Sequence, residues 1–182
     1  QSEGALYVLP SNHESRSVAT NMRKRSDIRR RFLELRNTID FIVVDTSPTP
    51  SLVNEAILAA TDHVLIPTDT EAFSALEGVP DSISHISNVE SAAEEAGFEA
   101  SKLLGIIPNK YRQRIALHRE VLKHLTEKYG EYVWSPLKLL VAHTYAQLGQ
   151  QFLYGAYPDD EATQQMWNVV SRIEKVVNNV AE

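Results

Sequence analysis

Short, continuous apolar runs alternate along the chain with longer stretches in which apolar residues recur every three or four positions. The short runs predict strands, because strands that are buried on both faces carry continuous apolar residues rather than alternating ones. Each run is bounded by polar residues or by residues that favour turns. The predicted strands are Ala5–Pro10, Phe41–Asp45, His63–Pro67 and Leu103–Pro108.

The longer stretches predict helices, because their apolar positions fall on one face at helical spacing. Pro80 lies inside one of them and predicts a kink or a break there, whereas Gly130 predicts the end of another. The predicted helices are Ser26–Arg36, Pro50–Ala60, Ala72–Ala96, Gln113–Tyr129 and Asp160–Val180.

Strands that alternate with crossover helices predict an α/β fold, a doubly wound and mostly parallel sheet with helices on both faces. The length of 182 residues fits a single domain over residues 1–182. In such sheets ligands bind beyond the carboxyl ends of the strands. The residues that follow each predicted strand are therefore the first candidates for a functional site.

The composition excludes several kinds of functional site. The chain has no cysteine, which excludes disulfides, thiolate metal sites and thiol nucleophiles. No apolar run approaches the roughly 20 residues that a membrane-spanning helix needs. The six histidines lack the spacing of metal ligands, so we expect structural or surface roles for them.

The net charge of −6 is unevenly distributed. Residues 1–36 hold eight Lys/Arg against four Asp/Glu, and the remaining residues hold ten against twenty. This balance argues against a nucleic-acid footprint over the whole chain but allows a local one. The basic stretch Arg16–Arg36 is either a patch that binds phosphates or a solvated helix face whose arginines pair with acids from residues 37–182. The second interpretation is favoured because no aromatic residues interleave with the arginines.

The run Phe41–Asp45 ends in an acid and continues into Thr46, Ser47 and Pro48. In nucleotide hydrolases a carboxylate at such a strand end orients the water shell of Mg²⁺ beside the phosphates. The alternative is that Asp45 only caps a helix or a turn. Asp69 follows the next predicted strand and is either a second active-site acid or, by preference, a solvated loop residue.

The segment Phe41–Val79 resembles the Walker B and switch II region of the ParA family, the deviant-Walker ATPases that segregate plasmids and chromosomes. Three flanking segments are also similar to this family: Gly4–Asn12, Gly105–Gly130 and Tyr145–Tyr157. The resemblance covers nearly the whole chain and implies the P-loop NTPase fold.

Individual residues match the family pattern. The resemblance implies that Asp45 is the catalytic Walker B aspartate, which helps to hold Mg²⁺ through water. Thr46, Ser47 and Pro48 match the switch that senses the γ-phosphate, although Ser47 departs from the commoner double proline. Asn109 matches a position that contacts adenine in several relatives. Arg114 matches an arginine of the surface with which some relatives bind DNA.

The function that the resemblance implies is a ParA-like ATPase with ATP and Mg²⁺ as cofactors. Its expected partners are a second copy of the chain as a homodimer, non-specific DNA and a centromere-binding ParB-like protein. Its expected location is cytoplasmic and associated with the nucleoid. No membrane partner is expected, because the last predicted helix has only Arg172 and Lys175 as basic residues, unlike the membrane-targeting helix of the MinD branch.

The sequence contains no Gly-Lys-Ser/Thr, the family's signature for cradling phosphates. We therefore expect the chain to be the C-terminal part of such an ATPase, with the phosphate loop upstream. ATP hydrolysis is expected of the intact protein and is left open for this chain. Two alternatives remain: a relative without the P-loop that acts as a non-catalytic interaction module, and a ParA-like regulator of another process.

Overall fold

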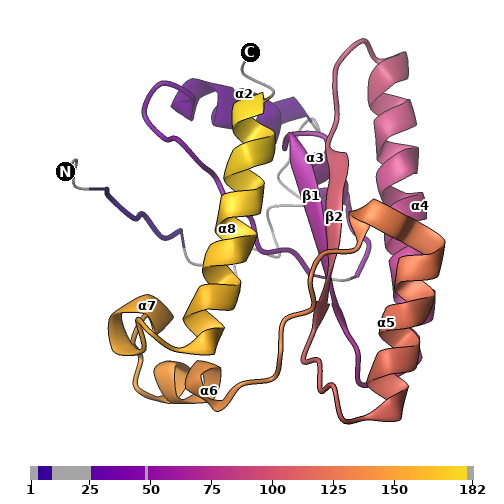
Figure 1. Cartoon of the computed structure of the whole chain (residues 1–182). Coiled ribbons are helices and arrows are strands. Elements are labelled where there is room, and N and C mark those ends of the chain that lie inside the picture. The colour runs from indigo at the N-terminus through magenta and orange to yellow at the C-terminus, as the bar shows by residue number, and fades with distance from the viewer. Residues whose placement is uncertain (1–3, 10–25, 48, 180–182) are drawn as a thin grey trace. The chain divides into compact units, whose positions relative to one another are not determined.

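The structure, a computed structural model, describes residues 4–9, 26–47 and 49–179, and it contains two parallel strands joined by a long helix. Strands β1 (His63–Asp69) and β2 (Lys102–Asn109) pair, and α4 (Ser74–Glu95) connects them (Figure 1). The Lys102 amide donates to the Asp62 carbonyl at one end of the pair, and the Thr70 amide donates to the Asn109 carbonyl at the other. Both strands therefore run in the same direction, as a helical crossover requires.

An extended segment that the sequence did not predict runs beside β2. Val133 and Lys138 form isolated parallel bridges with Ile106 and Tyr111. The Trp134 amide donates to the Ile106 carbonyl at 2.9 Å, and the Leu137 amide donates to the Pro108 carbonyl at 2.8 Å. This segment extends the backbone pairing beyond β2. Its short apolar stretches, interrupted by Ser135 and Pro136, explain why no strand was predicted there.

Helices flank the strands on both sides, as the sequence predicts. In the part of the chain from Leu104 onward, α8 (Glu161–Asn179) and α5 (Ala116–Tyr129) lie on opposite sides of the strands in Figure 1. The predicted stop of α5 is confirmed, because Gly130 takes a positive φ of 55° that a residue with a Cβ adopts only with strain. The remaining elements here are short: η2 (Gly130–Tyr132), α6 (Val141–Leu148) and α7 (Leu153–Ala156).

The chain divides into two compact units. One comprises the chain up to Val64 together with Ser84–Leu103, and the other comprises Leu65–Ile83 together with the chain from Leu104 onward. In the first unit α2 (Ser26–Leu35) contacts α3 (Leu52–Leu58). The Arg29 guanidinium donates to the carbonyls of Ala59 and Glu99 at 3.2 and 2.8 Å. The single domain expected for residues 1–182 stays a prediction.

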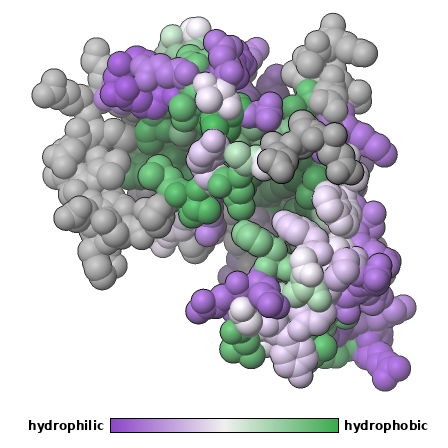
Figure 2. Space-filling model, turned by 90° about the vertical axis from the view of Figure 1, so that its left-hand side faces the viewer, coloured by the Kyte–Doolittle hydropathy of each residue, from purple (hydrophilic) through white to green (hydrophobic). Residues whose placement is uncertain are grey.

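Two of the predicted strands are wrong in the part of the chain that the structure describes. Residues 5–9 and Phe41–Asp45 are in no strand, and none of the described residues pairs with their backbones. Leu9 is 98% exposed and Val43 is 93% exposed, and Figure 2 shows apolar side chains open to the surface. An apolar run becomes a strand only where a neighbour accepts and donates its backbone hydrogen bonds. Pro10 lies outside the described residues.

Pro80 neither breaks α4 nor ends it. A proline removes one backbone donor from the helix ladder. The adjacent Val79 is 1% exposed, and its burial holds this turn of α4 in place. The predicted break is wrong because packing outweighs the lost hydrogen bond, whereas the alternative, a kink at Pro80, stays a prediction.

Trp134 determines how closely the extended segment approaches β2. Its side chain is 3% exposed, and its Nε1 is buried without a hydrogen-bond partner among the described residues. A Cβ placed on Gly105 would lie 2.1 Å from Trp134 Nε1 and 2.6 Å from Cε2. The indole therefore packs directly on the backbone of β2, and only glycine leaves room for it.

We expect Gly105→Ala to lower the free energy of unfolding by about 1–3 kcal/mol, because the added methyl group forces Trp134 out of its site. Chemical denaturation monitored by tryptophan fluorescence measures this loss. Gly78→Ala is the matched control, because nothing lies within 4 Å of a Cβ at this helical position. Equal stability of the two variants would contradict the described packing of Trp134.

Candidate functional site

The predicted Walker B acid stands at the end of an extended segment in the first unit. Asp45 is exposed, and none of the described residues forms an ion pair or hydrogen bond with its carboxylate. Thr46 and Ser47 are exposed beside it, and Pro48 lies outside the described residues. The carboxylate is therefore open to solvent, which suits an acid that holds a cation through water.

A turn that links the Asp45 segment to α3 is held by one amide side chain. Asn54 Nδ2 donates to the carbonyls of Ser47 and Thr49 at 2.7 and 2.9 Å. Ser51 is the N-cap of α3, and its hydroxyl accepts a hydrogen bond from the main-chain amide of Asn54 at 3.1 Å. Ser47 and Thr49 are thus fastened to the start of a helix. Sequence reasoning did not single out Asn54, although an N-cap serine followed three positions later by a polar residue was visible.

The carboxyl ends of β1 and β2 meet in the second unit, where Asn109 lies. Its Oδ1 accepts from the Lys110 amide at 2.8 Å. Its side-chain nitrogen has no hydrogen-bond partner in the described part of the chain. Lys110 has a positive φ of 54°, which a residue other than glycine adopts at some cost.

Asp69 is not a free acid, and the preferred interpretation of it as a solvated loop residue is wrong, because it is the last residue of β1 and is paired. It is about half exposed, and its Oδ2 lies 2.6 Å from Lys110 Nζ. The hydrogen bond and the charge of Asp69 raise the pKa of the Lys110 ammonium above its ordinary value. Glu71 similarly faces Arg112, at 3.9 Å between Oε1 and Nη2.

Beneath these surface pairs lies a buried polar cluster that sequence reasoning missed. Thr70 is fully buried and His118 is 3% exposed. The Thr70 hydroxyl lies 2.8 Å from His118 Nδ1 and 3.0 Å from the Asn109 carbonyl. The Arg112 amide donates to the same Nδ1 at 3.2 Å. Nothing in the sequence distinguishes His118 from the other histidines, because the partners come from three separate segments.

Arg114 is exposed in the turn before α5 and has no ion-pair partner among the described residues. It shares this loop and helix start with Lys110, Arg112 and Arg119. Lys110 and Arg112 face acids, whereas Arg119 donates to the Gln113 carbonyl at 2.9 Å. Four basic residues within ten positions form a local cluster, which sequence reasoning overlooked in favour of the N-terminal stretch.

That N-terminal basic stretch is largely paired where the structure describes it. Arg30 lies 3.9 Å from Asp27 and 3.7 Å from Glu34, and Arg31 lies 2.8 Å from Glu34. Arg29 binds backbone carbonyls and lies over the Phe98 ring at 5.9 Å. These contacts agree with the favoured interpretation of a helix face, but the acids that pair with Arg30 and Arg31 belong to α2 itself, whereas the sequence predicted acids from residues 37–182. Residues 16–25 lie outside the described part of the chain.

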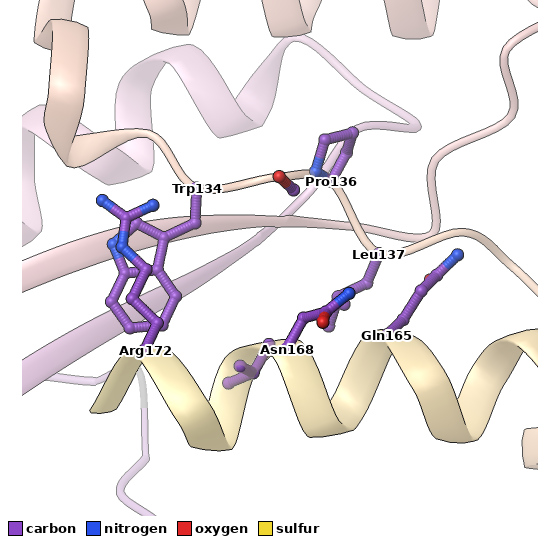
Figure 3. Close-up of a pocket in the computed structure, with 8 residues that line it drawn as sticks. Trp134, Pro136, Leu137, Gln165, Asn168 and Arg172 are labelled. Atoms are coloured by element: carbon purple, nitrogen blue, oxygen red, sulfur yellow. The ribbon is translucent and has the colours of Figure 1, made fainter. Parts of the chain in front are cut away.

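A small cavity of about 80 Å³ lies between α8 and the segment Trp134–Leu137 (Figure 3). The Arg172 guanidinium lies over the Trp134 ring at 4.5 Å and donates to the Glu131 carbonyl. Gln165 Oε1 accepts from the Lys138 amide at 2.9 Å. Because Arg172 and Gln165 already bind the chain itself, these contacts fasten α8 to the extended segment.

The described residues lack two other kinds of feature, a direct metal site and a membrane-spanning helix. No group of three or more His, Asp or Glu side chains in this part of the chain is arranged to hold a metal ion directly. None of the helices within it combines the length and the apolar character needed to cross a membrane.

Comparison with known proteins places these features in a family. A family model for an AAA domain matches residues 1–96. An uncharacterised protein of Pseudomonas putida is 27% identical over 135 residues, which are 72% of this chain and 49% of that protein. The chromosome-partitioning ATPase Soj of Treponema pallidum is 26% identical over 136 residues, which are 72% of this chain and 52% of Soj. The chain thus spans about half the length of these curated relatives.

Solved structures show the same fold. The apo form of McdA from Cyanthece matches with a TM-score of 0.63 at 17% identity, covering 82% of this chain and 60% of McdA. The cell division ATPase MinD of Pyrococcus furiosus matches with a TM-score of 0.58 at 18% identity, covering 84% of this chain and 59% of MinD. The predicted α/β fold class is confirmed.

We expect Asn54→Ala to lower the free energy of unfolding of the 182-residue chain by about 1–2 kcal/mol, because two backbone carbonyls lose their donor. Urea denaturation followed by circular dichroism measures the change. Asn88→Ala is the control, because Asn88 is exposed within α4 and alanine favours a helix at both positions. If Asn54→Ala were as stable as Asn88→Ala, the amide would not hold the turn.

Proposed function

The chain belongs to the AAA-domain family of ParA- and MinD-like ATPases, and on this premise we propose that it is part of a ParA-like partitioning ATPase. The whole protein would bind ATP and Mg²⁺, form a homodimer and bind DNA non-specifically during plasmid or chromosome segregation. The observation that carries the proposal is the open carboxylate of Asp45, followed directly by a turn that Asn54 fastens to α3.

Asp45 is proposed to hold the water shell of Mg²⁺. An acid that is already paired cannot orient such a shell without losing its partner, and none of the described residues occupies this carboxylate. The ion, when bound, neutralises charge on the transferred phosphoryl group. The contribution of this chain would be the placement of the Asp45 carboxylate directly after residues 41–44.

Thr46, Ser47 and Pro48 are proposed to respond to the γ-phosphate. The carbonyls of Ser47 and Thr49 are hydrogen-bonded to Asn54 in the first turn of α3. A displacement of Ser47 would therefore pull on that helix directly. This coupling supports a switch in spite of the serine that replaces the commoner proline.

Asn109 is proposed to contact the adenine base. Its Oδ1 is engaged with the Lys110 amide, which leaves the side-chain nitrogen as a donor for a ring nitrogen of the base. Its main-chain carbonyl is held by Thr70. The side chain therefore presents an amide NH2 group with both of its donors unused by the described residues.

Arg114 is proposed to bind DNA phosphates together with the neighbouring basic residues of the 110–119 cluster. Its guanidinium is exposed and free of acidic partners in the described part of the chain. Such contacts give binding that depends little on sequence and strongly on salt. A centromere-binding ParB-like protein as the stimulating partner, and a cytoplasmic, nucleoid-associated location, complete the proposal.

A non-catalytic interaction module is the second candidate. Leu6, Leu9 and Val43 lie in extended segments and are between 73% and 98% exposed. Extended apolar backbone without a neighbour favours the addition of strands from a partner. This candidate predicts a stable complex and no nucleotide binding by the natural protein, which isothermal titration with ATP and Mg²⁺ would distinguish.

In the natural full-length protein, we expect Asp45→Ala to abolish Mg²⁺-dependent ATP hydrolysis while the fold is retained. Phosphate release measured against Mg²⁺ concentration tests this, with circular dichroism as the check on folding. Asp40→Ala removes an exposed acid from the same segment and should leave turnover unchanged. Full activity of Asp45→Ala would remove this residue from the metal site.

We expect Arg114→Ala to weaken binding to DNA of any sequence and to reduce the slope of log K against log salt by about 1. Fluorescence anisotropy with two unrelated duplexes, over a series of salt concentrations, measures both effects. Lys123→Ala removes one charge from an exposed position on α5 and serves as the control. If both variants lose affinity equally, the effect reflects net charge and the proposed role of Arg114 fails.

A further inference from the structure

We propose that His118 is a positioning residue that fixes the loop from Asn109 to Arg112 through an unprotonated Nδ1. The inference rests on the proposed function, in which this loop contacts the base of ATP. His118 is buried beneath this loop, and its hydrogen-bond partners Thr70 and Arg112 belong to the chain itself.

The hydrogen bonds determine which ring nitrogen carries the proton. The Arg112 amide can only donate, and it lies 3.2 Å from His118 Nδ1. Nδ1 must therefore accept, so the neutral imidazole carries its proton on Nε2. The Thr70 hydroxyl lies 2.8 Å from the same nitrogen and 3.0 Å from the Asn109 carbonyl, and its single proton is shared between these two acceptors.

This one nitrogen connects three separate parts of the chain. Thr70 directly follows β1, Arg112 belongs to the loop after β2, and His118 stands in the first turn of α5. The Thr70 amide also binds the Asn109 carbonyl at 3.0 Å. The cluster thus ties the residue proposed to contact the base to both strand ends and to the next helix.

The loop needs such support because its backbone is strained. Lys110 has a φ of 54°, a conformation that persists only where surrounding contacts impose it. The Lys110 amide is held by Asn109 Oδ1, and the Tyr111 amide donates to the Leu137 carbonyl at 2.9 Å. His118 supplies the matching contact at Arg112, so three consecutive amides of the loop are anchored.

Burial makes the cluster difficult to replace by packing alone. His118 is 3% exposed and Thr70 is fully buried, so water cannot substitute for a missing acceptor. An apolar side chain of similar size would fill the space but leave the Thr70 hydroxyl and the Arg112 amide without the ring nitrogen. The role is therefore specific to an acceptor at the Nδ1 position.

Isosteric variants test this specificity. In His118→Asn the side-chain oxygen can take the place of Nδ1, whereas in His118→Gln the longer amide takes the place of Nε2. Hydrogen exchange of the Arg112 amide, measured by NMR on the 182-residue chain, is the first readout. We expect wild-type protection in His118→Asn and exchange about tenfold faster in His118→Gln, as the loss of one hydrogen bond predicts. Equal exchange in both variants would overturn the proposal.

A second readout needs no variant and guards against misfolding. Long-range proton–nitrogen correlation spectra of the wild-type imidazole should show His118 protonated on Nε2 alone. Protonation on Nδ1 would exclude Nδ1 as the acceptor and overturn the proposal directly.

The functional readout is the affinity of the natural full-length protein for ATP with Mg²⁺. We expect binding by the wild type and by His118→Asn, and weaker binding, by about tenfold, by His118→Gln at equal folded fraction. Equal affinity of the two variants would overturn the role of His118 in positioning this loop. A wild type that binds no ATP would instead overturn the proposed function, while the exchange and tautomer measurements would still decide whether His118 holds the loop.

Discussion

Parallel pairing of β1 and β2 is the constraint on which the second unit depends. Because the strands run the same way, their carboxyl ends meet, and the Thr70 amide reaches the Asn109 carbonyl. The crossover through α4 enforces this direction. Everything proposed for the base-contacting loop begins from this meeting point, since the loop leaves β2 at Asn109.

The polar contacts near this point contribute differently to stability, depending on how deeply they are buried. The pair Asp69–Lys110 and the pair Glu71–Arg112 are about half exposed, so solvent screens them and they contribute little to stability. The contacts of Thr70 with His118 are shielded from water, and losing them costs more. The polar cluster under the loop, rather than the ion pairs above it, is what holds the loop in one conformation.

The extended segment from Val133 to Leu139 lies beside β2 as a third strand would, and close packing holds it there. Trp134 lies against the bare backbone of Gly105, and the Arg172 guanidinium lies over the indole ring. The segment also donates hydrogen bonds from its main-chain amides to carbonyls of β2 and to the Gln165 side chain of α8. Its irregular sequence gave no strand pattern, which is why only the contacts reveal its place in the sheet.

The sequence by itself determined the α/β class, the strands around His63–Pro67 and Leu103–Pro108, and the boundaries of the main helices to within a few residues. It did so because these strands are short continuous apolar runs, whereas a helix that buries one face has apolar residues every three or four positions. Tertiary structure alone decided that Phe41–Asp45 pairs with no other segment among the described residues. It also decided that Asn54 holds the turn before α3 and that Thr70 and His118 hold the loop after β2. The physical reason is that backbone pairing and buried hydrogen bonds need partners from distant segments, and no local pattern encodes those partners.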